Sequence, residues 1–479
     1  ALGKIKNYFD KPKNHRGKLI LPCGTGKSLV GYWASKELRS KNIVVVVPSL
    51  ALIKQTFNSW AKENISENNN FDWIVICSDK STIKSKRDEI TIQLADLGVR
   101  VENKVDKIAE WLKLNNQTKV VFVTYDSSHL LSKAAKILNF KFDLGIFDEA
   151  HKTAGNKNSK FTYLLKNKNI SINRRIFMTA TERFYSGVNK NIYSMSDSKI
   201  YGNLIHELSF KNALNMKRQD GSPILVDYQL IRIVVSDQEV IDLIADNKLL
   251  KPRKLINWDK DIEAHTLASA LALKKAFKEF EVNKLISFHS SLGRAELFSQ
   301  FLEKLNKYGK TNNNFIAGDM PTFKRQNKVD AFINSKKSVL SNARCLTEGV
   351  DIPICDAVLF ADPKESKIDI VQACGRALRP YKGKKYGFII VPILINSKDS
   401  KIEKINKAYK SIMSTIDAIG FQDTRIVDYF DAITSGKKYK SRKPTEEYIT
   451  SSYEKDFDEI YNAVNLKIVS RLHGFIKKK

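Results

Sequence analysis

Short runs of β-branched and aromatic residues recur along most of this chain, and stretches with helical periodicity separate them. This alternation predicts parallel sheets covered by helices, because parallel strands need a crossover segment and a helix is the usual one. Two blocks have this pattern. The strands expected in the first are residues 18–21, 43–47, 73–77, 119–124, 144–147 and 175–178. Those expected in the second are residues 229–235, 284–289, 314–317, 338–341, 357–360 and 387–391.

The blocks suggest the domain organisation. Residues 185–227 are polar and contain Gly187, Gly202, Gly221 and Pro223, which predicts a linker. After Pro392 the strand pattern fades, and residues 401–419 and 454–472 have helical patterns. We therefore expect an α/β protein with two tandem parallel-sheet domains, at residues 1–215 and 216–395, followed by a small helical accessory region at 396–479.

The charge balance favours a polyanionic partner. The chain has 81 Lys and Arg residues against 52 Asp and Glu residues, a net charge of +29. Such an excess is typical of proteins that bind nucleic acid, since each neutralised phosphate releases counterions. The alternative is that the excess serves solubility, or that it follows from the Lys-, Asn- and Ile-rich protein composition that an AT-rich genome encodes.

The cysteines and the apolar runs exclude other classes of protein. The five cysteines are scattered without a Cys-x-x-Cys spacing, which argues against a disulfide framework or a zinc site and favours a reducing, cytoplasmic location. The longest apolar run, at residues 43–53, is far shorter than the ~20 residues that span a bilayer. We therefore expect no membrane association.

A glycine-containing segment between a predicted strand and a predicted helix has the features of a phosphate-binding loop. In such loops, glycines let backbone N–H groups face the phosphates of the nucleotide. A lysine contacts the β- and γ-phosphates, and a serine hydroxyl can bind Mg²⁺. The expected ATP-binding residues are Cys23, Gly24, Thr25, Gly26, Lys27 and Ser28. The strict pattern has glycine where this chain has Leu21, so an ordinary glycine-rich turn is the alternative.

A second polar segment follows the apolar strand at 144–147. Asp148 is expected to hold Mg²⁺, and Glu149 to orient and deprotonate the attacking water. Alone, such a segment could be a solvated strand end. Because it and the phosphate loop each follow a predicted strand in the expected order, the two together predict an NTP hydrolysis site.

Further segments extend the pattern and resemble the motifs of superfamily 2 helicases. They are residues 48–52, 124–127, 179–181, 286–289, 347–351 and 372–379. The last reads Gln-x-x-Gly-Arg-x-x-Arg, which is rare by chance. With Asp148-Glu149-Ala150-His151, the chain resembles the DEAH-type helicases and translocases of this superfamily. The resemblance implies two RecA-like domains with ATP, bound with Mg²⁺, in the cleft between them.

The resemblance also implies roles for matching residues. It gives Arg376 and Arg379 as arginine fingers, Gln372 as a γ-phosphate sensor, Gly349 and Asp351 as further ATP contacts, and His151, Thr179 and Thr181 as residues that couple hydrolysis to movement. Arginine fingers contribute about 10³ to 10⁵ in rate, because a phosphate loop alone neutralises the transferred group incompletely. Without the motif order, Arg376 and Arg379 would suggest a solvated helix face.

The expected nucleic-acid contacts are Ser49, Thr124 and Thr347, which would bind the backbone without reading sequence. Hydroxyls after strands also commonly cap helices, which is the alternative. Glu182 follows Thr181 where the family often has proline, and this predicts a less rigid exit from that motif. The adenine-reading glutamine of the family would precede residue 1, so ATP is the default nucleotide.

Residues 174–181, 201–210 and 340–353 resemble the motor subunits of restriction enzymes, which track along duplex DNA. We find no nuclease metal cluster and no methyltransferase signature, so such a module is expected either to lie outside this sequence or to be missing altogether. A basic run at 437–443 could grip duplex DNA; a solvated loop is the alternative. An NTP-switched clamp and an RNA helicase stay open as alternatives, whereas the second block argues against a kinase or GTPase.

Overall fold

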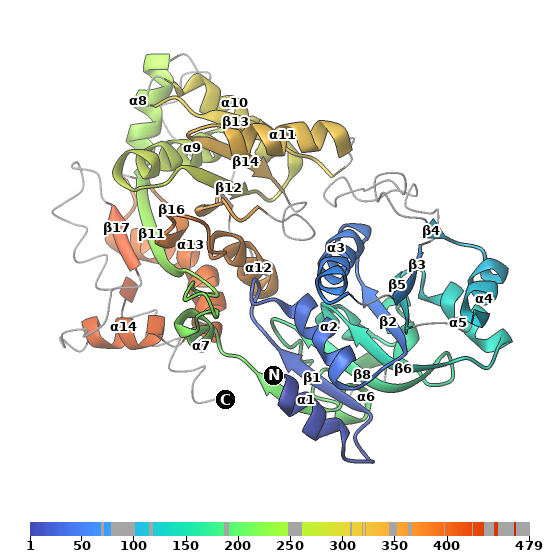
Figure 1. The fold of residues 1–479 in the computed structure, drawn as a ribbon. Helices are drawn as coiled ribbons and strands as arrows, with labels where there is room; N and C mark the ends of the chain where they lie inside the picture. The colour runs from blue at the N-terminus through green and yellow to red at the C-terminus, as the bar shows by residue number, and fades with distance from the viewer. Residues whose placement is uncertain are drawn as a thin grey trace. The chain divides into compact units, whose positions relative to one another are not determined.

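The computed structural model describes residues 1–68, 71–77, 101–114, 118–185, 191–247, 261–306, 309–318, 320, 322–343, 352–362, 366–396, 398–423, 425–434, 445–448 and 464–465. Within this part the chain forms two compact units, which meet in sequence between Ser209 and Phe210. Each unit contains a sheet of parallel strands with helices around it (Figure 1).

In the first unit the described strands form an eight-stranded parallel sheet in the order β10-β1-β8-β6-β2-β5-β3-β4. The strands are β1 (Arg16–Ile20), β2 (Asn42–Val47), β3 (Phe71–Ile76), β4 (Val101–Glu102), β5 (Thr118–Thr124), β6 (Lys141–Phe147), β8 (Ser171–Thr179) and β10 (Asn203–Glu207). The helices are α1 (Leu2–Phe9), α2 (Lys27–Glu37), α3 (Leu50–Ser66), α4 (Val105–Lys113), α5 (Ser128–Ile137) and α6 (Ser198–Tyr201), with the 3-10 helices η3 (Ala150–Thr153) and η4 (Lys160–Leu165). The short strands β7 (Gly155–Asn156) and β9 (Ile192–Tyr193) pair antiparallel.

The sheet is buried on both faces, which is why its central strands are continuous apolar runs. In β2, Val45 and Val47 pack with residues of α1, α2 and α3, among them Trp60. The alternate residues Val44 and Val46 pack on the other face, with residues of α4, α5 and η4. Successive side chains of a strand point to opposite faces, so one run of valines supplies both cores.

The expectation of a plain linker at 185–227 is wrong in part. Residues 203–207 form β10, which pairs in parallel with β1 at the edge of the first sheet. Gly202 precedes it with φ 73°, and a Cβ there would lie 1.9 Å from the carbonyl oxygen of Arg16. The strand was not predicted because four of its five residues are at least partly exposed, and an edge strand of this kind lacks an apolar pattern.

In the second unit the described strands form a seven-stranded parallel sheet in the order β13-β14-β12-β15-β16-β11-β17. The strands are β11 (Asp227–Ser236), β12 (Lys284–Phe288), β13 (Asn312–Phe315), β14 (Ser338–Asn342), β15 (Ala357–Phe360), β16 (Tyr386–Ile395) and β17 (Thr445–Tyr448). The helices are α7 (Phe210–Asn215), α8 (Asp237–Asn247), α9 (Ile262–Glu279), α10 (Leu292–Lys304), α11 (Thr322–Asn334), α12 (Lys367–Ala377), α13 (Lys401–Gln422) and α14 (Arg425–Thr434).

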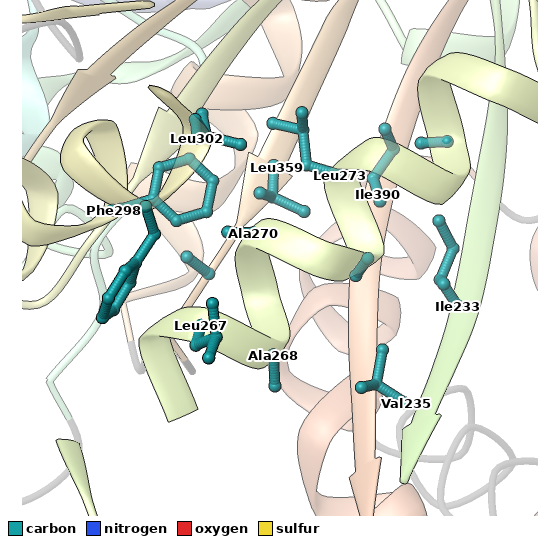
Figure 2. Close-up of a cluster of buried hydrophobic side chains, with 14 of the residues drawn as sticks. Ile233, Val235, Leu267, Ala268, Ala270, Leu273, Phe298, Leu302, Leu359 and Ile390 are labelled. Atoms are coloured by element: carbon teal, nitrogen blue, oxygen red, sulfur yellow. The ribbon is translucent and has the colours of Figure 1, made fainter. Parts of the chain in front are cut away.

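The core of this unit is built around α9. Figure 2 shows Leu267, Ala268, Ala270 and Leu273 of this helix against side chains of β11, β15 and β16. The alanines let the helix backbone lie close to the sheet, and Phe298 of α10 packs beside it.

The predicted fold class, two parallel-sheet α/β domains followed by helices, is confirmed. Helices α13 and α14 follow β16 as expected, whereas the later strand β17, which pairs with β11 in the same sheet, was not expected. Of the helix predicted at 454–472, the structure describes residues 464–465 alone, which are helical, and the basic run at 437–443 falls outside the described residues. Among the helices that the structure describes, none is long and apolar enough to cross a membrane.

Candidate active site

The polar segments predicted for the first unit follow the carboxyl ends of neighbouring strands. The phosphate loop follows β1, Thr179 ends β8, Asp148 follows β6, Ser49 lies beyond β2 and Thr124 ends β5, and these strands are consecutive in the sheet. Ligands of open parallel sheets bind at this edge. The sheet order therefore brings together segments far apart in the sequence.

Two glycines shape the loop between β1 and α2. Gly24 and Gly26 both have φ 84°, in the left-handed region that glycine adopts without a steric penalty. The Thr25 hydroxyl donates a hydrogen bond to the carbonyl oxygen of Pro22 at 2.8 Å, which closes the turn. Gly26 is the N-cap of α2 and provides no side chain to bond the first amides of the helix. The loop therefore has the backbone of a phosphate-binding site.

Buried polar atoms beside the loop fit a polyphosphate and a cation. The Ser28 hydroxyl oxygen is buried and makes no hydrogen bond within the described part of the chain. The same holds for the ammonium nitrogen of Lys27, whose nearest described charge is a Glu149 carboxylate oxygen at 3.5 Å. Buried polar groups are normally hydrogen-bonded, so these two atoms are available for phosphate oxygens and a bound metal ion.

The segment after β6 is held in a specific conformation. The amide of Asp148 donates to the carbonyl oxygen of Val46, which ties it to β2. Glu149 has φ 47°, uncommon for a residue other than glycine, and its amide donates to an Asp148 carboxylate oxygen at 2.9 Å. Backbone in such a sparsely populated region often occurs at functional sites. The conformation directs the Glu149 carboxylate toward Lys27.

The charges of this pair depend on one another. Burial alone would lower the pKa of Lys27, but the Glu149 carboxylate and further neighbours outweigh it and raise the pKa. For Glu149, burial favours the neutral acid, while the charge of Lys27, with smaller effects from His151 and Lys152, lowers the pKa. The carboxylate is therefore ionised at neutral pH, the form that a proton acceptor requires.

His151 and the threonines beyond β8 extend these contacts. The Nδ1 atom of His151 lies 3.4 Å from a Glu149 oxygen and 2.9 Å from the Thr179 hydroxyl. That hydroxyl also donates to the carbonyl oxygen of Thr181. Burial lowers the pKa of His151 to about 4, so the ring is neutral at pH 7 and contributes hydrogen bonds rather than charge. The predicted coupling residues thus contact one another and the predicted base.

Glu182, the departure from the family pattern, has a buried partner. Its carboxylate accepts a hydrogen bond from the Lys18 ammonium at 2.5 Å, and Lys18 also donates to the Met195 carbonyl oxygen at 2.9 Å. The ion pair joins β1, immediately before the phosphate loop, to the exit of β8. The sequence signal for this ion pair is Lys18 itself, a charged residue at the start of the apolar run that leads into the phosphate loop.

The nucleic-acid candidates of this unit have local hydrogen bonds. Ser49 is the N-cap of α3 and accepts from the amide of Leu52. The Thr124 hydroxyl donates to the Ser127 hydroxyl at 3.0 Å and is buried. Both residues thus have the local capping and turn-forming contacts that were weighed as the alternative.

In the second unit, Gln372 and Arg376 lie one turn apart on α12, and Arg379 follows the helix. Residues four apart share a helix face, and both Gln372 and Arg376 are largely buried. Thr347, Gly349 and Asp351 lie outside the described residues.

Comparison with known proteins gives two family matches. Residues 1–184 match the family described as "Type III restriction enzyme, res subunit", and residues 268–381 match "Helicase conserved C-terminal domain". Together they include every helicase motif named above, whereas strands β10, β11, β16 and β17 lie outside both matches. The probable helicase A859L of African swine fever virus is 26% identical over 430 residues, which cover 88% of this chain and 43% of that protein. The putative ATP-dependent helicase IRC3 of Saccharomyces cerevisiae is 34% identical over 157 residues, 33% of this chain and 22% of that protein.

Among solved structures, the ATP-dependent Type ISP restriction-modification enzyme LlaBIII bound to DNA superposes with a TM-score of 0.79. It is 26% identical, and the match covers 98% of this chain and 32% of that one. The chain thus spans less than half the length of the helicase A859L and a third of the length of the restriction enzyme.

Proposed function

We propose that this chain, a superfamily 2 helicase related to the motors of restriction enzymes, couples ATP hydrolysis to translocation along duplex DNA. One observation carries the proposal: a continuous set of contacts joins Lys27 through Glu149 and His151 to Thr179. These contacts connect the phosphate loop with a second element of the same sheet edge. Binding or hydrolysis of ATP at the phosphate loop can therefore change the structure at the end of β8, where Thr179 lies.

The chemistry is assigned to residues of the first unit. The amides of residues 23–28 and the Lys27 ammonium bind the phosphates, and Glu149 orients the attacking water and accepts its proton. Ser28 and Asp148 would hold Mg²⁺, which supplies positive charge at the phosphates. When ATP binds, Lys27 exchanges its carboxylate partner for phosphate. The Glu149 carboxylate then loses the charge that most lowers its pKa and becomes a stronger base.

The second unit is proposed to complete the site. Arg376 and Arg379 supply positive charge to the transferred phosphoryl group, and Gln372 senses the γ-phosphate. Gly349 and Asp351 make further ATP contacts. His151, Thr179 and Thr181 pass the change to the nucleic-acid segments, where Ser49, Thr124 and Thr347 contact the backbone.

The choice of DNA as the nucleic-acid partner is inferred from the charge of the chain and from its relatives. A net charge of +29 favours a polyanion. The restriction-modification enzyme with this fold is bound to DNA in its solved structure. We propose that a nuclease or methyltransferase module, where one acts with this motor, is supplied by chain beyond these residues.

Two measurements test the proposal. The ATPase rate is compared without nucleic acid and with single-stranded DNA, duplex DNA and RNA, and duplex DNA should stimulate it most. A triplex-displacement assay on linear duplex then tests movement, with displacement expected in the unmodified protein and none in Lys27→Ala. Stimulation by RNA alone would favour an RNA helicase, and duplex stimulation without displacement would favour a clamp.

A further inference from the structure

The hydroxyl of Tyr125 connects two segments of the first unit across an intervening strand. Tyr125 directly follows β5, and its hydroxyl donates a hydrogen bond of 2.8 Å to the backbone carbonyl oxygen of Asp148, after β6. In the sheet, β2 lies between β5 and β6. The Tyr125 amide donates to the Val47 carbonyl oxygen and the Asp148 amide to that of Val46. The ends of three strands are thus joined at one point.

The side chain of Tyr125 is held at both its ring and its hydroxyl. The residue is 1% exposed, and its ring stacks on Phe161 with centroids 5.1 Å apart and planes 21° apart. The Ser128 hydroxyl donates to the Tyr125 carbonyl oxygen at 2.7 Å. Burial raises the pKa of Tyr125, with a smaller effect from Asp148, so the hydroxyl keeps its proton and stays a donor.

The peptide unit that Tyr125 contacts carries the hydrolytic residues. Its carbonyl belongs to Asp148 and its N–H to Glu149, and that N–H donates to the Asp148 carboxylate. Because a peptide is planar, rotation of this unit turns the carbonyl and the N–H together. Glu149 enters its left-handed conformation directly after this peptide. A shift of the Tyr125 hydroxyl that moves this carbonyl would therefore displace both the Asp148 carboxylate and the Glu149 side chain.

We propose that Tyr125 is a positioning residue that transmits nucleic-acid binding at the turn after β5 to the orientation of the peptide between Asp148 and Glu149. This role rests on the proposed function, because it needs nucleic acid to contact the turn that begins at Thr124. Tyr125 itself contacts no reacting atom. It sets the positions of two groups when nucleic acid is bound: the Glu149 carboxylate, which is the proposed base, and the Asp148 carboxylate, which is the proposed metal ligand.

The test is Tyr125→Phe, which keeps the stacked ring and removes only the donor. Tyr201→Phe is the matched control, since its buried hydroxyl pairs with Thr153 and its ring packs on Phe177. For each protein, kcat and KM for ATP are measured with and without nucleic acid, together with nucleic-acid affinity and thermal unfolding. In Tyr125→Phe the ratio of stimulated to basal kcat should fall by about three- to tenfold, the range for one hydrogen bond. KM for ATP and nucleic-acid affinity should stay near those of the unmodified protein, because the removed hydrogen bond contacts neither ligand.

A second variant, Phe161→Leu, loosens the stacked ring and should lower the same ratio. An unchanged ratio in both variants would overturn the coupling role, and so would an equal fall in basal and stimulated rates or an equal effect of Tyr201→Phe. If no nucleic acid stimulates the unmodified protein, the proposed function fails, and the coupling role fails with it. The unmodified protein therefore distinguishes the two failures.

Discussion

The ammonium nitrogen of Lys27 lies 3.5 Å from a carboxylate oxygen of Glu149, with only 10% and 11% of the two side chains exposed. The residues come from loops after β1 and β6, which β8 separates in the sheet. Removing one partner of a buried pair leaves the other charge uncompensated. At Glu149, a substitution that keeps the shape of the side chain therefore helps to separate effects on chemistry from effects on folding.

Glu149→Gln should bind ATP and fail to hydrolyse it. The amide keeps the shape of the side chain but cannot accept the proton from water, so kcat should fall by about 10² to 10⁴. Lys27→Ala should lose turnover through weaker phosphate binding. Nucleotide-binding titrations and steady-state ATPase assays measure both. Hydrolysis by Glu149→Gln at the unmodified rate would show that another residue is the base.

Arg376→Ala should lower kcat by about 10³ or more, because the charge acts chiefly on the transition state. Folding and nucleic-acid affinity should remain near those of the unmodified protein. Single-turnover hydrolysis with saturating ATP measures the effect. A loss of ATP affinity at an unchanged maximal rate would instead identify Arg376 as a ground-state contact.

Glu182→Ala should destabilise the first unit by about 1–3 kcal/mol, because Lys18 stays buried with a lost partner. The double variant Lys18→Met, Glu182→Leu removes both charges and should recover part of the loss. Glu110→Ala is the control, since its ion pair with Lys107 is exposed on both sides. Denaturant unfolding measures the change, and equal effects of Glu182→Ala and Glu110→Ala would contradict a structural role for the pair.

Asp356 should make the second unit less stable as the pH rises. Burial raises the pKa of its carboxyl from 3.8 to about 6, although amides of Asn283 and Lys284 bond to it. The folded state then binds the proton more tightly than the unfolded chain, so the stabilising contribution is complete below pH 3.8 and is lost as the pH rises through about 6. Relative to Asp356→Asn, the unmodified protein should lose roughly 2–3 kcal/mol of unfolding free energy across this window. A parallel pH dependence in both proteins would contradict the assignment.

The basic run at 437–443 should contribute to DNA affinity without reading sequence. Replacing Lys437, Lys438, Lys440, Arg442 and Lys443 with serine should weaken duplex binding equally for unrelated sequences and reduce its salt dependence. ATP affinity should not change. Fluorescence anisotropy at several salt concentrations measures this, and an unaltered salt slope would indicate a loop that does not contact DNA.

The features that were predictable from the sequence depend on near neighbours in the chain. The valines of β2 indicate a strand buried on both faces, and Gly24 and Gly26 indicate a loop with positive φ. Asp148 and Glu149 are recognisable because charge directly follows an apolar strand. Propensity, periodicity and side-chain type are local properties, so they identified the fold class and the candidate residues of the phosphate site.

Other features depend on which strands pair. Residues 203–207, three of which are polar, form a strand because β1 offers an edge for pairing, and no local pattern signals this. Lys18 and Glu182 are 164 residues apart, and Tyr125 reaches Asp148 across the end of β2. Such contacts follow from the order β1-β8-β6-β2-β5, which brings loops from distant segments to one edge. The sequence by itself thus determined which side chains could do the chemistry, and only the tertiary structure decided which of them touch, because contact between distant residues depends on sheet order and burial rather than on neighbours along the chain.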